Sequence, residues 1–205
     1  MNRVIEPETT SIEEIIGRTF LRKKHYLREK DKETLYSVQE CDNQELTGCK
    51  FVLLFFSAAW CPPCQQFTQV LKDFYHEVNI DGKVIEVLYI SLDRNEAEFK
   101  DAYAKMPWLT YRFENEMHTK IREYYDIKGV PYCFVLDPVT GFLISKKGRK
   151  DICDLGVTCL KNWADEISEQ KTKQQLLREG FAIAEEYRIK KEAEEKRKRE
   201  EEEKL

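Results

Sequence analysis

Two cysteines separated by two residues form the most informative feature of this sequence. They occur in the segment Trp60-Cys61-Pro62-Pro63-Cys64. Thiols at this spacing can alternate between a dithiol and a disulfide, and the thiolate form of such a cysteine is a nucleophile. The segment therefore predicts a site for thiol–disulfide exchange.

Zinc binding is the alternative chemistry for such a pair, and the rest of the sequence disfavours it. A structural zinc site usually needs a second Cys-x-x-Cys pair or two histidines three to five residues apart. The chain has no second pair, and His25, His76 and His118 are far apart. An inert structural disulfide is also disfavoured, because an intracellular pair stays reduced unless it cycles. We therefore predict no metal and no cofactor.

The residues on either side of the pair predict a strand and a helix that position it. Residues 51–56 are apolar without polar alternation, as expected of a strand buried on both faces. Cys61 would begin the helix, where free N–H groups and the helix dipole stabilise a thiolate and lower its pKa, and first-turn prolines are tolerated. Cys61 is thus predicted to attack and Cys64, one turn later, to resolve the mixed disulfide. Apolar residues at helical spacing are Phe67, Val70, Leu71, Phe74 and Tyr75.

Several segments of the sequence resemble the thioredoxin superfamily, and within it the branch of tryparedoxins and nucleoredoxins. Residues 55–68, FFSAAWCPPCQQFT, are similar to that branch's FSA-x-WCPPC-x-x-FT signature. Residues 92–109 resemble its D-x-x-E-x-x-F and Y-x-x-MPW block, and residues 125–131 resemble the segment that ends in its cis-proline. Residues 135–141 resemble a following strand and hairpin. Together the similarity extends over about residues 34–168.

This resemblance implies an α/β fold of the thioredoxin type, with a central mixed β-sheet flanked by helices, and disulfide reductase activity. It also implies that the loop before the cis-proline faces the cysteines and that its backbone pairs with an extended substrate peptide. A trans turn at Pro131 and core packing of Trp108 are the alternatives. The substrate-binding residues implied by the resemblance are Trp60, Pro62, Pro63, Trp108, Val130 and Pro131.

The sequence departs from the family pattern in three places. Ordinary thioredoxins place a buried aspartate, which manages protons, at the position of Phe55, so proton transfer here must use water or another group. Tyr132 and Cys133 replace a threonine and an aliphatic residue, and we interpret Cys133 as a small core residue in preference to a redox residue. Residues 154–163 replace the family's D-P-x-G-x-x-FPW segment.

Composition and charge narrow the class of protein. The chain has 205 residues, of which 41% are hydrophobic and 35% charged, enough for one packed domain with extensions. A net charge of −4 gives no electrostatic argument for nucleic-acid binding. The sequence shows neither a signal-peptide pattern nor a membrane-spanning stretch, and seven cysteines do not form a secreted framework. We expect a cytoplasmic protein, with the nucleus and the cilium as alternatives.

The distribution of charge divides the chain into three predicted parts. These are a basic N-terminal extension, 1–33, a thioredoxin-like domain, 34–168, and a charged helical tail, 169–205. The tail carries an apolar stripe that is expected to fold back on the domain, form a coiled coil or bind a partner protein. Gly180 weakens the prediction of one unbroken helix. The stripe residues are Ile167, Leu176, Leu177, Phe181, Ala184 and Tyr187.

Two functions are consistent with these features. The first is an oxidoreductase that reduces protein disulfides, such as those of a peroxidase, and is itself reduced by an unidentified dithiol or reductase. The second is an adaptor that its tail and basic arm attach to a large assembly, such as an axonemal or other cytoskeletal complex. The intact cysteine pair favours the first function, and the tail favours attachment.

Overall fold

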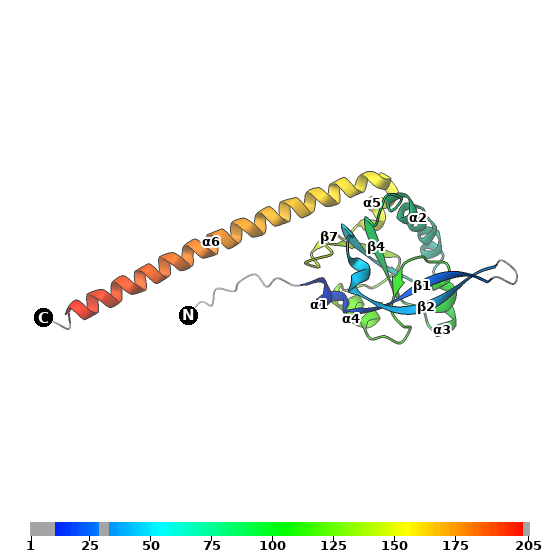
Figure 1. The fold of residues 1–205 in the computed structure, drawn as a ribbon, viewed down its shortest axis with the longest axis horizontal. Helices are drawn as coiled ribbons and strands as arrows, with labels where there is room; N and C mark the ends of the chain where they lie inside the picture. The colour runs from blue at the N-terminus through cyan, green and yellow to red at the C-terminus, as the bar shows by residue number, and fades with distance from the viewer. Residues whose placement is uncertain (1–10, 29–32, 203–205) are drawn as a thin grey trace. The chain divides into compact units, whose positions relative to one another are not determined.

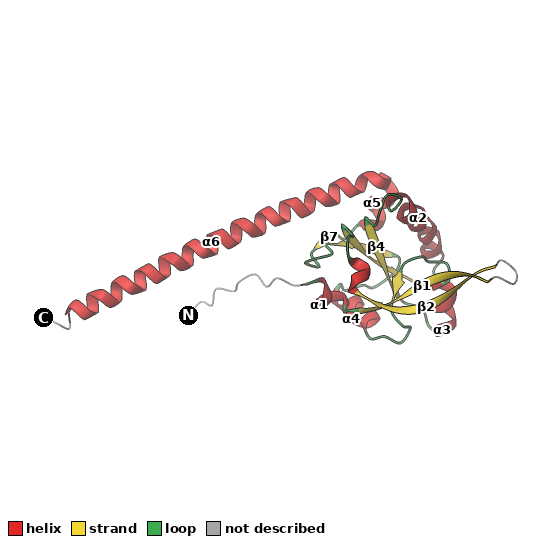
Figure 2. Cartoon of the chain, viewed as in Figure 1, coloured by secondary structure: helices red, strands yellow, loops and turns green. Residues whose placement is uncertain are grey.

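A mixed β-sheet lies at the centre of the computed structural model, which describes residues 11–28 and 33–202 (Figures 1 and 2). Within these residues the strand order is β2-β1-β5-β4-β3-β6-β7. Strand β3 pairs in parallel with β4 and antiparallel with β6, and β4 pairs in parallel with β5. The strands are β1 (Thr19–Arg28), β2 (Glu33–Asp42), β3 (Phe51–Ser57), β4 (Ile85–Ser91), β5 (Leu109–Thr110), β6 (Tyr132–Leu136) and β7 (Leu143–Ser145).

Helices cover both faces of the sheet, so the predicted α/β fold with a mixed sheet flanked by helices is confirmed (Figure 2). The α-helices are α1 (Ile12–Ile16), α2 (Pro62–Val78), α3 (Glu96–Tyr103), α4 (Met117–Tyr124), α5 (Gly148–Leu155) and α6 (Cys159–Glu202). Two short 3-10 helices are η1 (Asn43–Leu46) and η2 (Gly156–Thr158).

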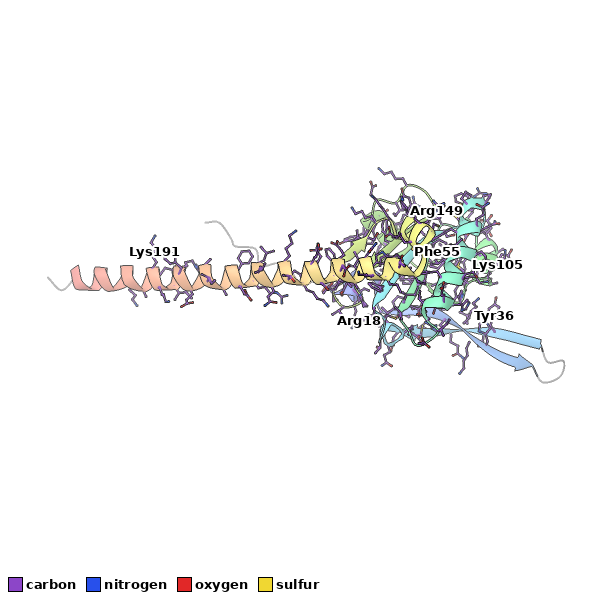
Figure 3. The ribbon with its side chains drawn as sticks, turned by 90° about the horizontal axis from the view of Figure 1, so that it is seen from above. Arg18, Tyr36, Phe55, Lys105, Arg149 and Lys191 are labelled. Atoms are coloured by element: carbon purple, nitrogen blue, oxygen red, sulfur yellow. A yellow bond between two sulfur atoms is a disulfide. The ribbon has the colours of Figure 1, made fainter. Side chains whose placement is uncertain are left out.

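Strand β3 is buried along its whole length, as its uninterrupted apolar sequence predicts. Successive side chains of a strand point to opposite faces. Val52, Leu54 and Phe56 accordingly belong to a core cluster that includes residues of α1 and α4. Phe55 points to the other face and contacts Phe67 of α2 at 5.6 Å between ring centroids. The strand that leads into the cysteine pair is therefore fixed from both sides, and Phe55 lies inside the domain (Figure 3).

The domain begins earlier than the boundary predicted at residue 34. Helix α1 and strand β1, in the predicted basic extension, contribute to the same sheet and core, because Ile16 and Phe20 are buried and β1 pairs with β2 and β5. Sequence analysis did not predict strand β1, because its many basic residues are more typical of a solvent-exposed segment. Arg22 forms an ion pair with the buried Glu86, and Lys23 is also buried. The segment is therefore part of the sheet and not a solvated arm.

The other predicted boundary, at residue 168, also differs from the structure. Helix α6 begins at Cys159, and its first turns belong to the domain, which ends at Trp163. Trp163 is buried against Phe51 and donates a hydrogen bond from Nε1 to Asp151 at 3.0 Å. Burial of this indole joins the start of the helix to the domain core.

From Ala164 the chain forms a unit of its own, which is the continuation of α6 to Glu202. The predicted helical tail is confirmed, and Gly180 does not interrupt it. Side chains project from its surface, as Lys191 illustrates (Figure 3). Among the described residues, no helix is both long enough and apolar enough to cross a membrane.

Candidate functional site

The cysteine pair lies at the N-terminus of α2, as predicted. Cys61 is the N-cap residue in an extended backbone conformation, and it forms a disulfide with Cys64, whose Cα lies 5.2 Å away. The backbone N–H of Cys64 donates to Cys61 Sγ at 3.3 Å. Pro62 and Pro63 occupy the first helical positions, where a missing N–H costs no intrahelical hydrogen bond. The helix thus begins so that one backbone N–H, that of Cys64, faces the sulfur of Cys61, because the two prolines have no N–H.

The two sulfurs differ in their access to solvent. Cys61 is 5% exposed, whereas Cys64 is fully buried. On the next turn of α2, the Thr68 hydroxyl donates to the carbonyl oxygen of Cys64 at 2.8 Å. An incoming thiol or disulfide can therefore reach only the outer sulfur, that of Cys61. The roles of Cys61 as the attacking and Cys64 as the resolving cysteine stay a prediction, for which this asymmetry is a structural argument.

The loop before β6 places Val130, the residue before Pro131, against the outer sulfur. The Val130–Pro131 peptide bond is cis, as the family resemblance implied. The carbonyl oxygen of Val130 lies 3.8 Å from Cys61 Sγ, and Val130 packs against the buried cluster of Ala58, Cys61 and Cys64. Pro131 is half-buried. The backbone next to the disulfide is therefore available for contact with a bound peptide.

Of the two tryptophans predicted beside the sulfur, only Trp60 lies at the surface. Its side chain is 42% exposed, and its Nε1 donates to the carbonyl oxygen of Leu92 at 3.1 Å. The guanidinium of Arg94 lies 5.1 Å above its ring. Trp108, in contrast, is fully buried against Phe55. The prediction that Trp108 contacts substrate is wrong, because the large ring fills the core under α2.

Asp93 organises the loop that precedes the cysteines, a role that sequence analysis did not assign. Its carboxylate accepts hydrogen bonds from the N–H of Ala59 at 2.6 Å, from the Tyr89 hydroxyl at 2.6 Å and from the Ser91 hydroxyl at 2.7 Å. The position of Asp93 just after a buried apolar strand was the available signal, because carboxylates at strand ends often anchor neighbouring loops. Asp93 thus connects the end of β4 to the residue before Trp60.

His118 lies beneath the same loop as a buried neutral imidazole. Its Nδ1 accepts from the backbone N–H of Ser91 at 3.0 Å, and its Nε2 donates to the carbonyl oxygen of Arg112 at 3.1 Å. Burial lowers the pKa of His118 to about 4. The described residues include no cluster of three potential metal ligands. His118 is therefore a structural support for the loop.

Phe55 and Cys133, two of the residues that depart from the family pattern near the site, are core residues, whereas Tyr132 is exposed. Phe55 is fully buried and contacts Tyr89 at 6.3 Å between ring centroids, so its position holds no proton donor or acceptor. Cys133 is buried, and burial raises the pKa of its thiol well above the usual value. A thiol in this state is a poor nucleophile, which agrees with the interpretation of Cys133 as a packing residue.

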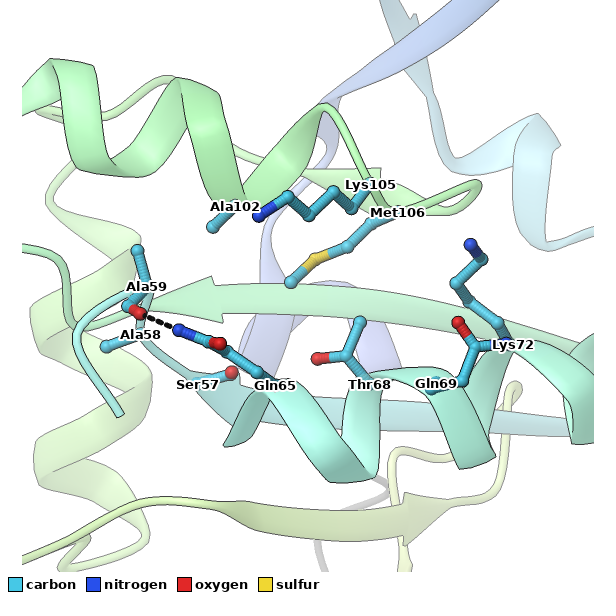
Figure 4. Close-up of a pocket in the computed structure, with 10 residues that line it drawn as sticks. All are labelled: Ser57, Ala58, Ala59, Gln65, Thr68, Gln69, Lys72, Ala102, Lys105 and Met106. Atoms are coloured by element: carbon cyan, nitrogen blue, oxygen red, sulfur yellow. Dashed lines mark hydrogen bonds between the residues drawn. The ribbon is translucent and has the colours of Figure 1, made fainter. Parts of the chain in front are cut away.

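Two cavities adjoin the cysteine segment on different sides. One, of about 430 Å³, is lined by Pro131 and by basic residues that include Lys146, Lys147 and Arg149. The other, of about 270 Å³, lies between α2 and the end of α3 and is lined by Ala58 and Ala59, among others (Figure 4). The lining of the first includes Pro131, which follows Val130, and the lining of the second includes the two residues that precede Trp60.

Known proteins match this chain over the same region. The thioredoxin-like family matches residues 48–141. Tryparedoxin from Trypanosoma brucei brucei is 37% identical over 106 residues, which are 51% of this chain and 73% of that protein. Nucleoredoxin from Mus musculus is 36% identical over 115 residues, which are 56% of this chain but only 26% of that protein. This chain therefore spans about a quarter of the nucleoredoxin.

Solved structures give the same result. Tryparedoxin II from C. fasciculata superposes with a TM-score of 0.52 and 36% identity, over 56% of this chain and 74% of the other. A structure of tryparedoxin II complexed with glutathionylspermidine superposes with a TM-score of 0.53 and 33% identity, over 58% and 81%. Strands β3, β4, β5 and β6, the helix that carries the cysteines and the cis-proline loop all lie within residues 48–141, which the thioredoxin-like family matches.

Proposed function

Because this chain belongs to the thioredoxin-like family, in the branch of tryparedoxins and nucleoredoxins, we propose that it is a thiol–disulfide oxidoreductase that reduces protein disulfides. Cys61 is the nucleophile and Cys64 the resolving residue. The observation that carries this proposal is the Cys61–Cys64 disulfide at the start of α2, with only Cys61 reachable from outside.

The reaction begins with both cysteines reduced. The Cys61 thiolate attacks one sulfur of the substrate disulfide, the S–S bond breaks, and the second substrate sulfur leaves as a thiolate that takes up a proton. Cys64 then loses its proton and attacks Cys61 Sγ in the mixed disulfide, which releases the first substrate sulfur as a thiol. Two electrons pass from the protein to the substrate, and a small dithiol or a reductase must return them.

The surface around Cys61 supports binding of an extended peptide. Trp60 offers an exposed ring face, and Val130 and Pro131 offer backbone next to the sulfur. Pro62 and Pro63 are exposed on the other side of Cys61. These five residues form the proposed substrate platform. Candidate substrates are protein disulfides such as those of a peroxidase, and the tryparedoxin II complex with glutathionylspermidine favours a small thiol as a further ligand.

Substrate trapping tests this proposal. Replacing Cys64 with serine removes the resolving thiol, so the mixed disulfide on Cys61 should persist. Full-length C64S protein incubated with a disulfide peptide should gain the mass of one peptide half, which intact-mass spectrometry detects. C61S protein is the control and should gain none. A folded C64S protein that forms no adduct under conditions where wild type oxidises would exclude the mechanism.

An adaptor role is a second candidate, because α6 presents apolar side chains to solvent. Leu176 is 63% exposed, and Tyr187 is 71% exposed. A partner protein in a large assembly, such as an axonemal or other cytoskeletal complex, would bury this face. Deleting residues 170–205 should preserve disulfide reduction and abolish co-sedimentation with the partner assembly. Loss of reduction with loss of folding would show instead that the tail stabilises the domain.

A compartment follows from the proposed chemistry. A cysteine pair that donates electrons to disulfides needs a reducing environment, which favours the cytoplasm, with the nucleus and the cilium as further sites.

A further inference from the structure

The cavity between α2 and α3 adjoins the cysteine segment and is lined largely by polar groups. Ala58 and Ala59, which immediately precede Trp60, form one end (Figure 4). Gln65 donates from Nε2 to the carbonyl oxygen of Ala59 at 2.6 Å. Thr68, which also lines the cavity, donates to the carbonyl oxygen of Cys64. Two residues that line the cavity are therefore hydrogen-bonded to the backbone of the segment that carries the reactive pair.

Two lysines give this cavity a positive charge without a counter-charge. Lys72 of α2 and Lys105, just after α3, both line it, and none of its lining residues is acidic. In the part of the chain that the structure describes, neither ammonium forms an ion pair or a hydrogen bond. Lys105 extends along the α3 side and Lys72 lies at the other end (Figure 4). Concave surfaces of one charge sign attract ligands of the opposite sign.

A third lysine adds to the positive potential behind this cavity. Buried Lys23 donates from Nζ to the carbonyl oxygens of Tyr103 at 3.0 Å and Ala104 at 2.9 Å, at the end of α3. Burial and the charge of Lys72 lower the pKa of Lys23 to about 8.

Asp73 is an acidic residue near the cavity, and among the described residues no ion pair joins it to Lys72 or Lys105. Asp73 accepts a hydrogen bond from the lining residue Gln69 at 2.9 Å, but Asp73 is exposed and does not line the cavity. The cavity volume of about 270 Å³ is large enough for a carboxylate-bearing side chain. Donors for its oxygens are the ammonium groups of Lys72 and Lys105 and the side-chain amides of the two glutamines.

We propose that this cavity, defined by Lys72, Lys105, Gln65 and Gln69, binds a carboxylate of an acidic segment next to the substrate cysteine. The inference rests on the proposed function, since it gives that same disulfide exchange a preference for acidic peptide substrates. A free inorganic anion such as phosphate offers the same oxygen acceptors, so the test separates these two sources.

The test compares two disulfide peptides that differ only in glutamate or glutamine beside the disulfide. The full chain, kept reduced by dithiothreitol, should reduce the glutamate peptide with a kcat/KM about five- to tenfold higher, as expected for two partly exposed charge pairs. The K72Q/K105Q double variant should lose this preference through a higher KM for the glutamate peptide. Its kcat and KM for the glutamine peptide should stay as in wild type.

Two matched variants locate the effect. K24Q/K50Q changes the net charge by the same amount at exposed lysines elsewhere and should keep the preference. K146Q/K147Q alters the cavity beside Pro131. Equal preference in wild type and K72Q/K105Q would overturn the proposal, and so would its loss in K146Q/K147Q alone.

A binding measurement independent of redox chemistry separates this inference from the proposed function. Fluorescence anisotropy follows a labelled glutamate peptide in which serines replace the cysteines. Weaker binding by K72Q/K105Q without turnover of either peptide by wild type would refute the oxidoreductase and keep the site. Turnover of the peptides by wild type, without any binding that depends on Lys72 and Lys105, would keep the oxidoreductase and refute the carboxylate site. Binding of inorganic phosphate at Lys72 and Lys105, with no peptide binding there, would identify a small-anion site and overturn the proposal.

Discussion

Replacing Asp93 with alanine should destabilise the protein and slow disulfide reduction through one set of lost contacts. The carboxylate accepts three hydrogen bonds, from Ala59, Tyr89 and Ser91. Ala59 directly precedes Trp60, so the loop that presents Cys61 depends on this anchor. Neither the cysteines nor the cis-proline changes in this variant, which makes it a test of positioning.

The magnitude follows from what each partner loses. A hydrogen bond to a charged group contributes about 1.5–3 kcal/mol. The N–H of Ala59 can regain part of this from water, since Ala59 is only half-buried. The hydroxyl of the fully buried Tyr89 cannot, and an unsatisfied buried donor costs about 1–3 kcal/mol. We therefore expect D93A to lower the free energy of unfolding by about 3 kcal/mol.

Urea unfolding followed by tryptophan fluorescence measures this difference, and reduction of a disulfide peptide measures the effect on the site. The kcat/KM of D93A should fall about tenfold or more, because the loop no longer holds Trp60 and Cys61 in place. S91A removes one of the three contacts to the carboxylate, together with the hydrogen bond from the Asp93 N–H to Ser91 Oγ, and should show a smaller loss in stability than D93A. D93N retains an acceptor for Ala59 and should show intermediate kinetics.

The reasoning is refuted if D93A unfolds within about 0.5 kcal/mol of wild type, the range of ordinary surface substitutions. Loss of stability with unchanged kcat/KM would also count against it, because it would show that the loop keeps its geometry without the anchor.

Two further predictions concern the tryptophans and the buried histidine. W108A should leave a cavity in the core and lower the free energy of unfolding by about 3–5 kcal/mol. W60A should change the free energy of unfolding by under about 1 kcal/mol and mainly raise the KM for a peptide disulfide. Equal losses of stability in the two variants would contradict the placement of the two rings. The pKa of His118 is about 4 in the folded chain and about 6.5 when unfolded, so below about pH 6.5 the unfolded chain binds a proton that the folded chain does not. Stability should therefore fall by about 3 kcal/mol as the pH drops from about 6.5 to about 4, and urea unfolding at each pH should show this fall in wild type but not in H118Q.

Local features of the fold were predictable because they depend on neighbouring residues. The apolar segment 51–56 is a buried strand, and the helix begins at the cysteines because two prolines suit a first helical turn. Val70 was predicted on the buried face of the helix but is 42% exposed. The part of α2 that packs against the domain covers a narrower range of its surface than its apolar residues do. Periodicity predicts the direction of a helix face but not the limits of the surface packed against it.

Features that depend on distant partners were not predictable from a single sequence. Strand β1 has so many basic residues that it resembled a solvated arm, yet Arg22 pairs with Glu86, which is 64 residues away in sequence. Trp163 and Cys159 are buried, although they lie in a segment that departs from the family pattern. Each of these residues owes its position to contacts with residues that are distant in sequence.

The sequence by itself determined the chemistry of this protein, because the reactive atoms, their spacing and the helix that begins at them all lie between residues 51 and 78. Tertiary structure alone decided which groups surround that chemistry. It buried Trp108 and left Trp60 exposed, brought Asp93 to the loop before the cysteines, and placed Lys72 and Lys105 around one cavity. The physical reason is that nucleophilicity and helix initiation are local properties, whereas burial and hydrogen bonding between segments depend on how the whole chain packs.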